Sequence, residues 1–281
     1  MEKFIFEKSK PDWSNNDILN ELDNFINIYE KRPIKNNKGG MLFPQMFSFF
    51  FLLKKLKPEL IIESGVYKGQ STWLIENTLP NSEIISLDID LSKREFISKK
   101  ALYSNKDFRF HNFSNIPENT LVFFDDHVNH IERIIESKFF NIKHIILEDN
   151  NSPGNGDFQT IKQLYNNHIY NHNPGILSLI KTSFFFNKII LKKIFNKSYN
   201  AKYDIDKISK RIRDGNNDED WFENINKIID CYYEFPPLAK YEDLIDLKFI
   251  KKPLFENIPE KFKIYLNLNK EYNFLTYIKL I

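Results

Sequence analysis

Short apolar runs alternate with amphipathic stretches through the middle of this chain. A short run of apolar residues is typical of a buried strand, whereas apolar positions three and four apart are typical of a helix. These patterns predict, in order, strand 60–63, helix 70–79, strand 83–88, helix 92–103, strand 108–113, strand 120–125, helix 128–138, strand 143–148 and helix 157–168. Such alternation predicts an α/β fold: a doubly wound, mostly parallel sheet with helices on both faces.

Further elements are predicted on either side of this alternation. Asn16 to Ile28 has helical spacing, and Met41 to Leu56 is a strongly apolar segment that leads into the first strand. Its sixteen residues include two lysines and are too few to span a membrane, so we expect a buried helix beside the sheet. Near the end of the chain we expect a helix at Trp221–Cys231 and a last strand at Phe274–Ile281.

A basic segment, residues 168–213, interrupts the alternation. It holds ten Lys or Arg against two acids, a local balance of +8. Three interpretations remain: an extra helix with solvated lysines, a lid over a ligand site, or a surface that meets an anionic or lipid-linked partner. The predicted organisation is therefore N-terminal helices at 1–57, an α/β domain at 58–167 and 218–281, and a basic helical insertion at 168–217.

The most informative stretch is LIIESGVYKGQSTWLI, residues 60–75. An apolar run ends at Glu63, glycines follow at positions 65 and 69, and a helical pattern comes next. A nucleotide cofactor needs this geometry, because glycine lets the backbone turn sharply and approach the ligand, while the helix N-terminus offers unpaired N–H groups. The spacing is E-x-G-x-x-x-G, unlike the G-x-G-x-x-G of dinucleotide enzymes. A carboxylate before the loop would repel a pyrophosphate but suits the cationic methionine portion of S-adenosylmethionine, so the loop favours a methyl donor over NAD.

An acidic side chain follows the next predicted strand. Glu83 to Leu87 leads into Asp88-Ile89-Asp90, roughly twenty residues beyond the glycine loop. A carboxylate at this strand end can accept hydrogen bonds from both ribose hydroxyls. Asp88 and Asp90 could instead cap a helix that starts near Ser92, but the glycine loop upstream favours the cofactor role for Asp88.

Polar clusters follow two later strands. One cluster contains Asp125, Asp126, His127 and His130, and the other contains Glu148, Asp149 and Asn150. The carboxyl ends of neighbouring strands converge, so these four carboxylates would repel one another unless something neutralises them. Carboxylate and amide oxygens suit a hard divalent cation, and the absence of clustered cysteines argues against zinc. The acids could instead cap helices and fix loops, but two acidic strand ends in register favour a metal.

Composition narrows the class of protein. The chain has 281 residues, of which 42% are hydrophobic, and can bury a sizeable core. Its net charge of +2 argues for neither nucleic acid nor a membrane as partner. The single cysteine, Cys231, excludes an internal disulfide and fits a reducing compartment. Because the N-terminus shows no apolar core followed by a cleavage site, we expect no signal peptide and a cytoplasmic location.

Four segments together resemble a known family: IESGVYKGQS, SLDIDLS, FFDDHVNH and IILEDN. They are similar to the metal-dependent class I methyltransferases grouped with cephalosporin hydroxylase-like proteins, rhamnosyl O-methyltransferases and macrolide sugar O-methyltransferases. More distantly, FFDDH and EDN resemble the metal-binding strand ends of catechol O-methyltransferase. The resemblance covers residues 38–165 and implies a Rossmann-like fold.

The resemblance also implies roles for the matching residues. Asp88 would bind the ribose, and the methionine part of the cofactor would be lined by Glu63, Gly65, Tyr67, Gly69 and Ser71. Mg²⁺ or a similar cation would be held by Asp126, Glu148 and Asp149, with Asn150 as a further candidate and Asp125 as an alternative to Asp126. The family places a histidine shortly after the first metal aspartate. This chain has His127 and His130, at offsets of one and four from Asp126, and either can be the base.

These roles predict S-adenosylmethionine-dependent O-methylation of a small-molecule hydroxyl, such as that of a sugar or secondary metabolite. The metal would lower the pKa of the hydroxyl and orient it, and His127 or His130 would remove its proton. The rival interpretation is a binding module that keeps the fold and docks a partner through the basic segment. Nucleic acid is not expected as a substrate, because the N-P-P-[YFW] motif used to stack a flipped base is absent. The oligomeric state stays open.

Overall fold

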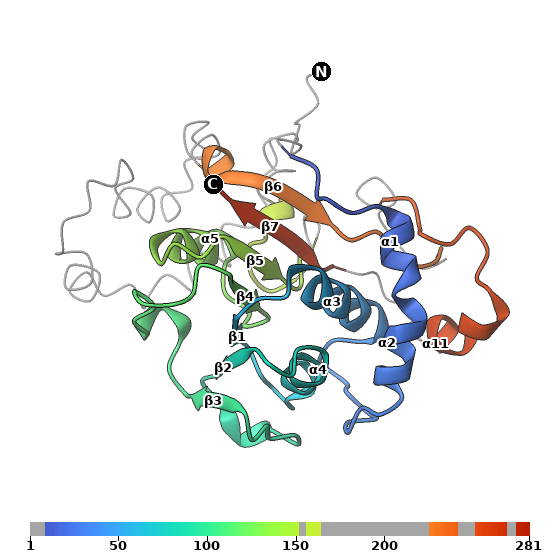
Figure 1. The fold of residues 1–281 in the computed structure, drawn as a ribbon, viewed down its shortest axis with the longest axis horizontal. Coiled ribbons are helices and arrows are strands. Elements are labelled where there is room, and N and C mark those ends of the chain that lie inside the picture. The colour runs from blue at the N-terminus through green and yellow to red at the C-terminus, as the bar shows by residue number, and fades with distance from the viewer. Residues whose placement is uncertain (1–8, 152–155, 164–224, 241–250, 269–273) are drawn as a thin grey trace.

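A sheet of seven strands forms the centre of the described part of the protein (Figure 1). The computed structural model describes residues 9–151, 156–163, 225–240, 251–268 and 274–281. The strand order is β3-β2-β1-β4-β5-β7-β6, and β7 runs antiparallel to both of its neighbours. The strands are β1 (Leu60–Ser64), β2 (Glu83–Leu87), β3 (Ala101–Ser104), β4 (Thr120–Phe124), β5 (His144–Leu147), β6 (Ile229–Glu234) and β7 (Thr276–Leu280). This confirms the predicted doubly wound, mostly parallel sheet, and also the predicted last strand.

The order in which the chain adds strands reverses at β1. β2 and β3 lie on one side of β1, and β4 and β5 lie on the other. The strands β2, β1 and β4 run parallel, so their carboxyl ends lie at one edge of the sheet. In open sheets of this kind ligands bind at such a switch point, outside the carboxyl ends of the strands. The fold therefore brings the glycine loop and the first acidic cluster together.

Two hydrophobic clusters cover the two faces of the sheet. Side chains alternate along a strand, so Ile61 of β1 packs into one cluster while Leu60 and Ile62 pack into the other. The first cluster contains residues of α1 (Asn15–Asn20), α2 (Leu22–Tyr29), α3 (Phe43–Leu56) and α4 (Gln70–Thr78), and the second contains residues of α5 (His130–Phe139). Helices on both faces explain why β1 and β4 are buried at every position.

Helix α3 confirms the expected buried helix beside the sheet. Eleven consecutive residues from Phe43 to Leu53 are buried, and Phe49 stacks on Phe123 of β4 with 4.3 Å between ring centroids. The helix has a proline in its first turn and ends where Lys57 adopts the left-handed conformation. Among the described residues no helix is both long and apolar enough to cross a membrane.

Two predicted elements between β2 and β4 are wrong. Residues 92–103 were expected as a helix, but only Leu91–Lys93 forms a 3₁₀ turn and β3 begins at Ala101. Contacts with the glycine loop take the place of helical hydrogen bonds here, because the N–H groups of Glu95 and Phe96 both donate to the carbonyl of Lys68. The strand expected at 108–113 is a 3₁₀ turn, Phe108–Phe110, whose N-cap is Asp107. The third strand of the alternation is therefore β3.

Other boundaries differ in smaller ways. The helix expected over Asn16 to Ile28 divides at Glu21, which ends α1 and begins α2. The helix expected at Trp221–Cys231 is helical only at 225–228 within the described residues, and Cys231 lies in β6. Of the helix expected at 157–168, residues 161–163 are helical. A short helix, α11 (Lys263–Leu268), precedes β7, and the basic segment lies outside the described residues.

Phe25 should be the main anchor of the N-terminal helices. Its ring lies 5.1–5.4 Å from the rings of Tyr29, Phe43, Phe47 and Phe50 and is fully buried. Phe25→Ala should lower the free energy of unfolding by about 3–5 kcal/mol, because it removes a large buried ring and leaves a cavity. The neighbouring exposed Asn24, changed to Ala, should alter it by about 0.5 kcal/mol or less. Urea unfolding followed by circular dichroism measures both, and equal midpoints for the two variants would contradict the packing described.

Candidate functional site

Two glycines shape the loop between β1 and α4. Gly65 has φ +100°, and a Cβ there would lie 2.0 Å from the carbonyl oxygen of Asp125. Gly69 has φ +90°, and a Cβ there would lie 2.4 Å from the carbonyl oxygen of Phe96. Both positions therefore require glycine on conformational and steric grounds. The loop packs directly against the backbone that follows β4.

Glu63 is a fully buried carboxylate at the end of β1. One oxygen, Oε2, accepts hydrogen bonds of 2.6 Å from the hydroxyls of Thr72 and Ser86. The other, Oε1, has no hydrogen-bond partner among the described residues. Burial raises the pKa of Glu63, against the lowering effect of the Ser71, Ser86 and Thr72 hydroxyls. The site thus contains a buried acid with one oxygen able to accept a donor.

Asp88 holds the glycine loop in the structure. Its Oδ2 accepts the N–H groups of Val66 and Tyr67 at 2.8 and 2.9 Å, and its Oδ1 accepts that of Asp90 at 2.8 Å. The capping alternative applies to Asp90, which is the N-cap of the Leu91–Lys93 turn. Tyr67 has φ +46° and its hydroxyl donates to the carbonyl of Lys38. Asp88 and Tyr67 therefore both lie at the glycine loop, with Asp88 accepting hydrogen bonds from it.

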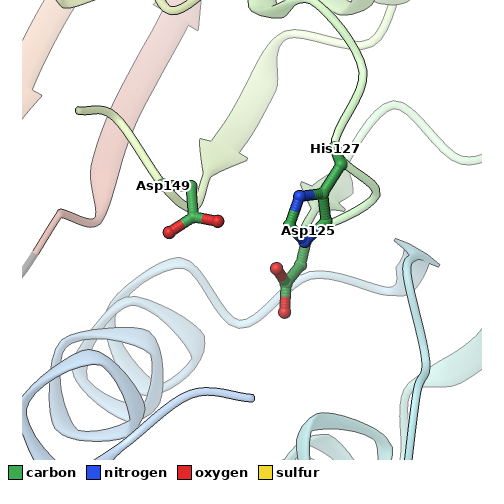
Figure 2. Close-up of side chains that lie close together, drawn as sticks. All are labelled: Asp125, His127 and Asp149. Carbon is green, nitrogen blue, oxygen red and sulfur yellow. The ribbon is translucent and has the colours of Figure 1, made fainter. Parts of the chain in front are cut away.

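Asp125, His127 and Asp149 form a group that could hold a metal ion. One ligand atom from each lies within 4.8 Å of the other two. Figure 2 shows Asp149, after β5, facing Asp125 and His127, which follow β4. His127 and Asp149 have φ of +57° and +53°, a left-handed conformation uncommon outside glycine. The two strand ends therefore converge, as the sequence predicted, and both adopt unusual backbone geometry there.

Burial and charge repulsion together determine the electrostatics of this group. Burial raises the pKa of Asp125 well above its usual range, and Asp149 and Asp126 raise it further. Burial likewise raises the pKa of Glu148 well above its usual range, with contributions from Asp125 and Asp149. Such shifts mean that negative charge is unfavourable here without a compensating cation. Glu148 lies beside the group, and a bound cation would relieve the repulsion.

Asp126, predicted as a metal ligand, makes different contacts. Its Oδ2 lies 2.7 Å from Nη2 of Arg133 and accepts the hydroxyl of Ser64 at 2.5 Å. The structure therefore groups Asp149 with Asp125, the alternative ligand, and pairs Asp126 with a buried arginine. Sequence reasoning missed Arg133. The available signal was its spacing in α5, three residues after the buried His130 and four before the buried Ser137.

The two candidate histidines have different environments. His130 is buried; its Nε2 lies 3.0 Å from the carbonyl oxygen of Glu148, and its Nδ1 accepts the N–H of Ile161. Burial lowers the pKa of His130 to about 3, so its ring is neutral near pH 7 and both nitrogens are engaged. His127 is exposed, and its Nδ1 lies 3.0 Å from Oδ2 of Asp157. Of the two candidate histidines, only His127 is exposed to solvent.

Asn150, the further candidate ligand, joins structural elements. Its Nδ2 donates to Thr276 Oγ1 at 2.7 Å and to the hydroxyl of Tyr232 at 2.9 Å, and its Oδ1 accepts the N–H of Lys162 at 3.0 Å. These contacts connect the end of β5 to β6, β7 and the segment around residue 161. Both functional groups of the amide are therefore occupied by protein.

Comparisons with known proteins give similar solved structures. No protein-family model and no curated protein matches the chain. CmcI with Mg and SAM is 12% identical with a TM-score of 0.40, over 99% of this chain and 88% of that one. SAH-bound Podospora anserina methyltransferase PaMTH1 is 13% identical with a TM-score of 0.36, over 50% and 73%. A putative caffeoyl-CoA O-methyltransferase from Staphylococcus aureus is 11% identical with a TM-score of 0.36, over 94% and 91%.

Two of these structures are named as methyltransferases, the class of protein that the sequence motifs resemble. The strand order and the antiparallel β7 give the chain a Rossmann-like fold, as that resemblance implied. Each likeness is low in sequence identity and in TM-score and carries no conclusion about function.

Two neighbouring aspartates should affect the stability of the metal-free protein in opposite directions. The raised pKa of Asp125 means that its ionised form destabilises the fold, so the stability of the protein falls as pH rises through that pKa. Asp125→Asn should therefore stabilise the protein by about 0.5–2 kcal/mol at pH 8 and much less at acidic pH. Asp126→Asn removes the partner of a buried arginine and should destabilise it by about 3–5 kcal/mol. Urea unfolding in EDTA across pH 5–8 tests both. A loss of stability in Asp125→Asn at pH 8 would mean that this carboxylate is a structural group.

Proposed function

We propose that the chain is an S-adenosylmethionine-dependent O-methyltransferase that requires a divalent cation and acts on a hydroxyl of a small molecule, such as a sugar or secondary metabolite. The observation that carries this proposal is the joint placement of two features. A glycine loop with a buried, half-partnered carboxylate lies in contact with the loop that bears Asp125 and His127. A methyl donor and a hydroxyl acceptor would therefore lie side by side.

The residues around the glycine loop fit a cationic methyl donor. S-adenosylmethionine supplies an electrophilic methyl group on a positively charged sulfur. Glu63 would hold the cationic methionine portion, because its Oε1 is buried without a partner among the described residues. Asp88 would accept a ribose hydroxyl at Oδ1, which accepts one N–H, whereas Oδ2 already accepts two. Gly65 and Gly69 let the backbone approach the ligand.

The acidic strand ends fit a hard cation. Asp125 and Asp149 would hold it, with Glu148 beside them, since oxygen ligands in an acidic cluster suit Mg²⁺ or Mn²⁺. Such an ion lowers the pKa of a bound hydroxyl and orients it. This set replaces Asp126 of the sequence prediction with Asp125, because Asp126 is paired with Arg133.

His127 is the proposed base. Asp157 lies at its Nδ1, so the proton of the neutral ring would stay on Nδ1 and leave Nε2 free to accept one. The ring belongs to the same group as Asp125 and Asp149, so a hydroxyl held there would lie within its reach. His130 would instead support the site, by bonding to the carbonyl of Glu148. The base is thus assigned to the exposed histidine.

Calorimetry with S-adenosylmethionine tests the donor site. The wild type should bind it, and Glu63→Gln should weaken binding roughly ten- to hundredfold, because a hydrogen bond to a charged group contributes about 1.5–3 kcal/mol. Glu83 is exposed at the start of β2, so Glu83→Gln is the matched control and should bind normally. No binding by the wild type, with or without Mg²⁺, would favour the rival interpretation of a non-catalytic binding module.

A second titration tests the cation site. Asp149→Asn should weaken Mn²⁺ binding and lower the methylation rate together, because it removes a ligand, whereas loss of a helix cap would cost only about 1 kcal/mol of stability. Asp90 caps the Leu91–Lys93 turn after β2, and Asp90→Asn should leave Mn²⁺ affinity unchanged. Should the wild type bind no Mn²⁺ even with S-adenosylmethionine present, the acids are structural and the cation is removed from the proposal.

A further inference from the structure

The loop after β4 carries three polar residues in succession, and the middle one faces a different environment from its neighbours. Asp125 and His127 belong to the group with Asp149 (Figure 2), whereas the Asp126 side chain contacts Arg133 and Ser64. The contacts of Asp126 therefore bear on how the residues on both sides of it are oriented.

Asp126 connects three parts of the fold. Its Oδ2 accepts the hydroxyl of Ser64, the last residue of β1, and lies 2.7 Å from Nη2 of Arg133 in α5. Its Oδ1 accepts the N–H of Val128 within the loop, at 3.3 Å. The backbone adds a further tie, since the N–H of Asp125 donates to the carbonyl of Ser64 at 2.8 Å. The loop is thus held to β1 and α5 through one carboxylate.

Arg133 is held in place independently of Asp126. The residue is fully buried, and Asp107 and Glu136 lie 2.8 and 2.7 Å from its guanidinium nitrogens. The guanidinium also lies over the ring of Phe124, 5.3 Å from its centroid. Burial disfavours its charge, but Asp126, Glu136 and Asp107 more than offset this and raise the pKa of Arg133, so it stays protonated. Arg133 is therefore a fixed positive charge beneath the loop.

We propose that the ion pair between Arg133 and Asp126 positions the cation site, by holding the loop after β4 so that Asp125 and His127 face Asp149. Arg133 and Asp126 are positioning residues and do not touch the cation. This inference rests on the proposed function, because it presumes a cation at Asp125 and Asp149. Beyond the proposed function, the inference states that the cation site depends on a buried arginine that does not itself bind the cation.

The direction in which Arg133→Lys changes cation affinity separates the positioning role from two alternatives. If Asp126 were itself a cation ligand held back by Arg133, weakening their ion pair would free it and tighten cation binding. If Arg133 acted only through its charge, Arg133→Lys would change nothing, because lysine carries the same charge. Positioning predicts weaker binding, since lysine cannot reproduce the planar guanidinium, which contacts Asp107 through Nη1 and Nη2 and Asp126 through Nη2.

The experiment measures Mn²⁺ affinity by electron paramagnetic resonance, in the presence of S-adenosylmethionine, together with the melting temperature. Arg133→Lys should weaken Mn²⁺ binding roughly 10- to 100-fold, the range found for residues that orient metal ligands. Ser64→Ala changes no charge and removes one hydroxyl from Asp126, so it should weaken binding in the same direction. If Arg133→Lys does not fold, Ser64→Ala still tests the positioning role.

Arg109→Lys is the matched control. Arg109 pairs with Asp107, Glu132 and Glu136 in the same ionic cluster, so the variant should lower the melting temperature without changing Mn²⁺ affinity. Equal or tighter Mn²⁺ binding in folded Arg133→Lys and Ser64→Ala would overturn the positioning role alone. An absence of Mn²⁺ binding in the wild type would overturn the proposed cation site and this inference with it.

Discussion

The contact between the two loops at the switch point constrains everything around it. No side chain fits between Gly65 and the Asp125 backbone, and hydrogen bonds from Gly65 to Leu87 and from Asp125 to Ser64 fix both loops to the strand ends. The loop proposed for the methyl donor and the loop proposed for the cation are therefore one packed unit. Movement of either loop would break these hydrogen bonds between the ends of β2, β1 and β4.

Negative charge is concentrated at this edge of the sheet, and it lowers the stability of the folded protein. Only part of the charge is neutralised by protein, because Arg133 pairs with Asp126 while the pKa values of Asp125 and Glu148 remain raised. Each pKa unit of such a shift corresponds to about 1.4 kcal/mol between protonation states. Buried acids of this kind are hard to explain as stabilising groups. They are expected where a protein binds cations, since a bound cation offsets the electrostatic repulsion that otherwise destabilises the fold.

Local patterns were sufficient to predict the strands and turns that carry the motifs. The glycine loop, Glu63 and Asp88 could be placed from sequence because turn geometry and strand burial are set by neighbouring residues. Residues 92–103 could not, because contacts with the glycine loop override their helical spacing. The partner of Asp126 was also beyond prediction. Arg133 lies in the next helix, and which of two adjacent aspartates turns toward it depends on packing across the sheet.

The position of β7 has a consequence for the order of folding. β6, residues 229–234, reaches the sheet through β7, residues 276–280, which lies between it and β5. A chain that has not yet incorporated β7 leaves β5 with an open hydrogen-bonding edge and β6 without its partner in the sheet. Unpaired edges promote association between chains, and pairing over long sequence separations is slow. The interval before β7 docks is therefore the stage at which this protein is most exposed to aggregation during folding.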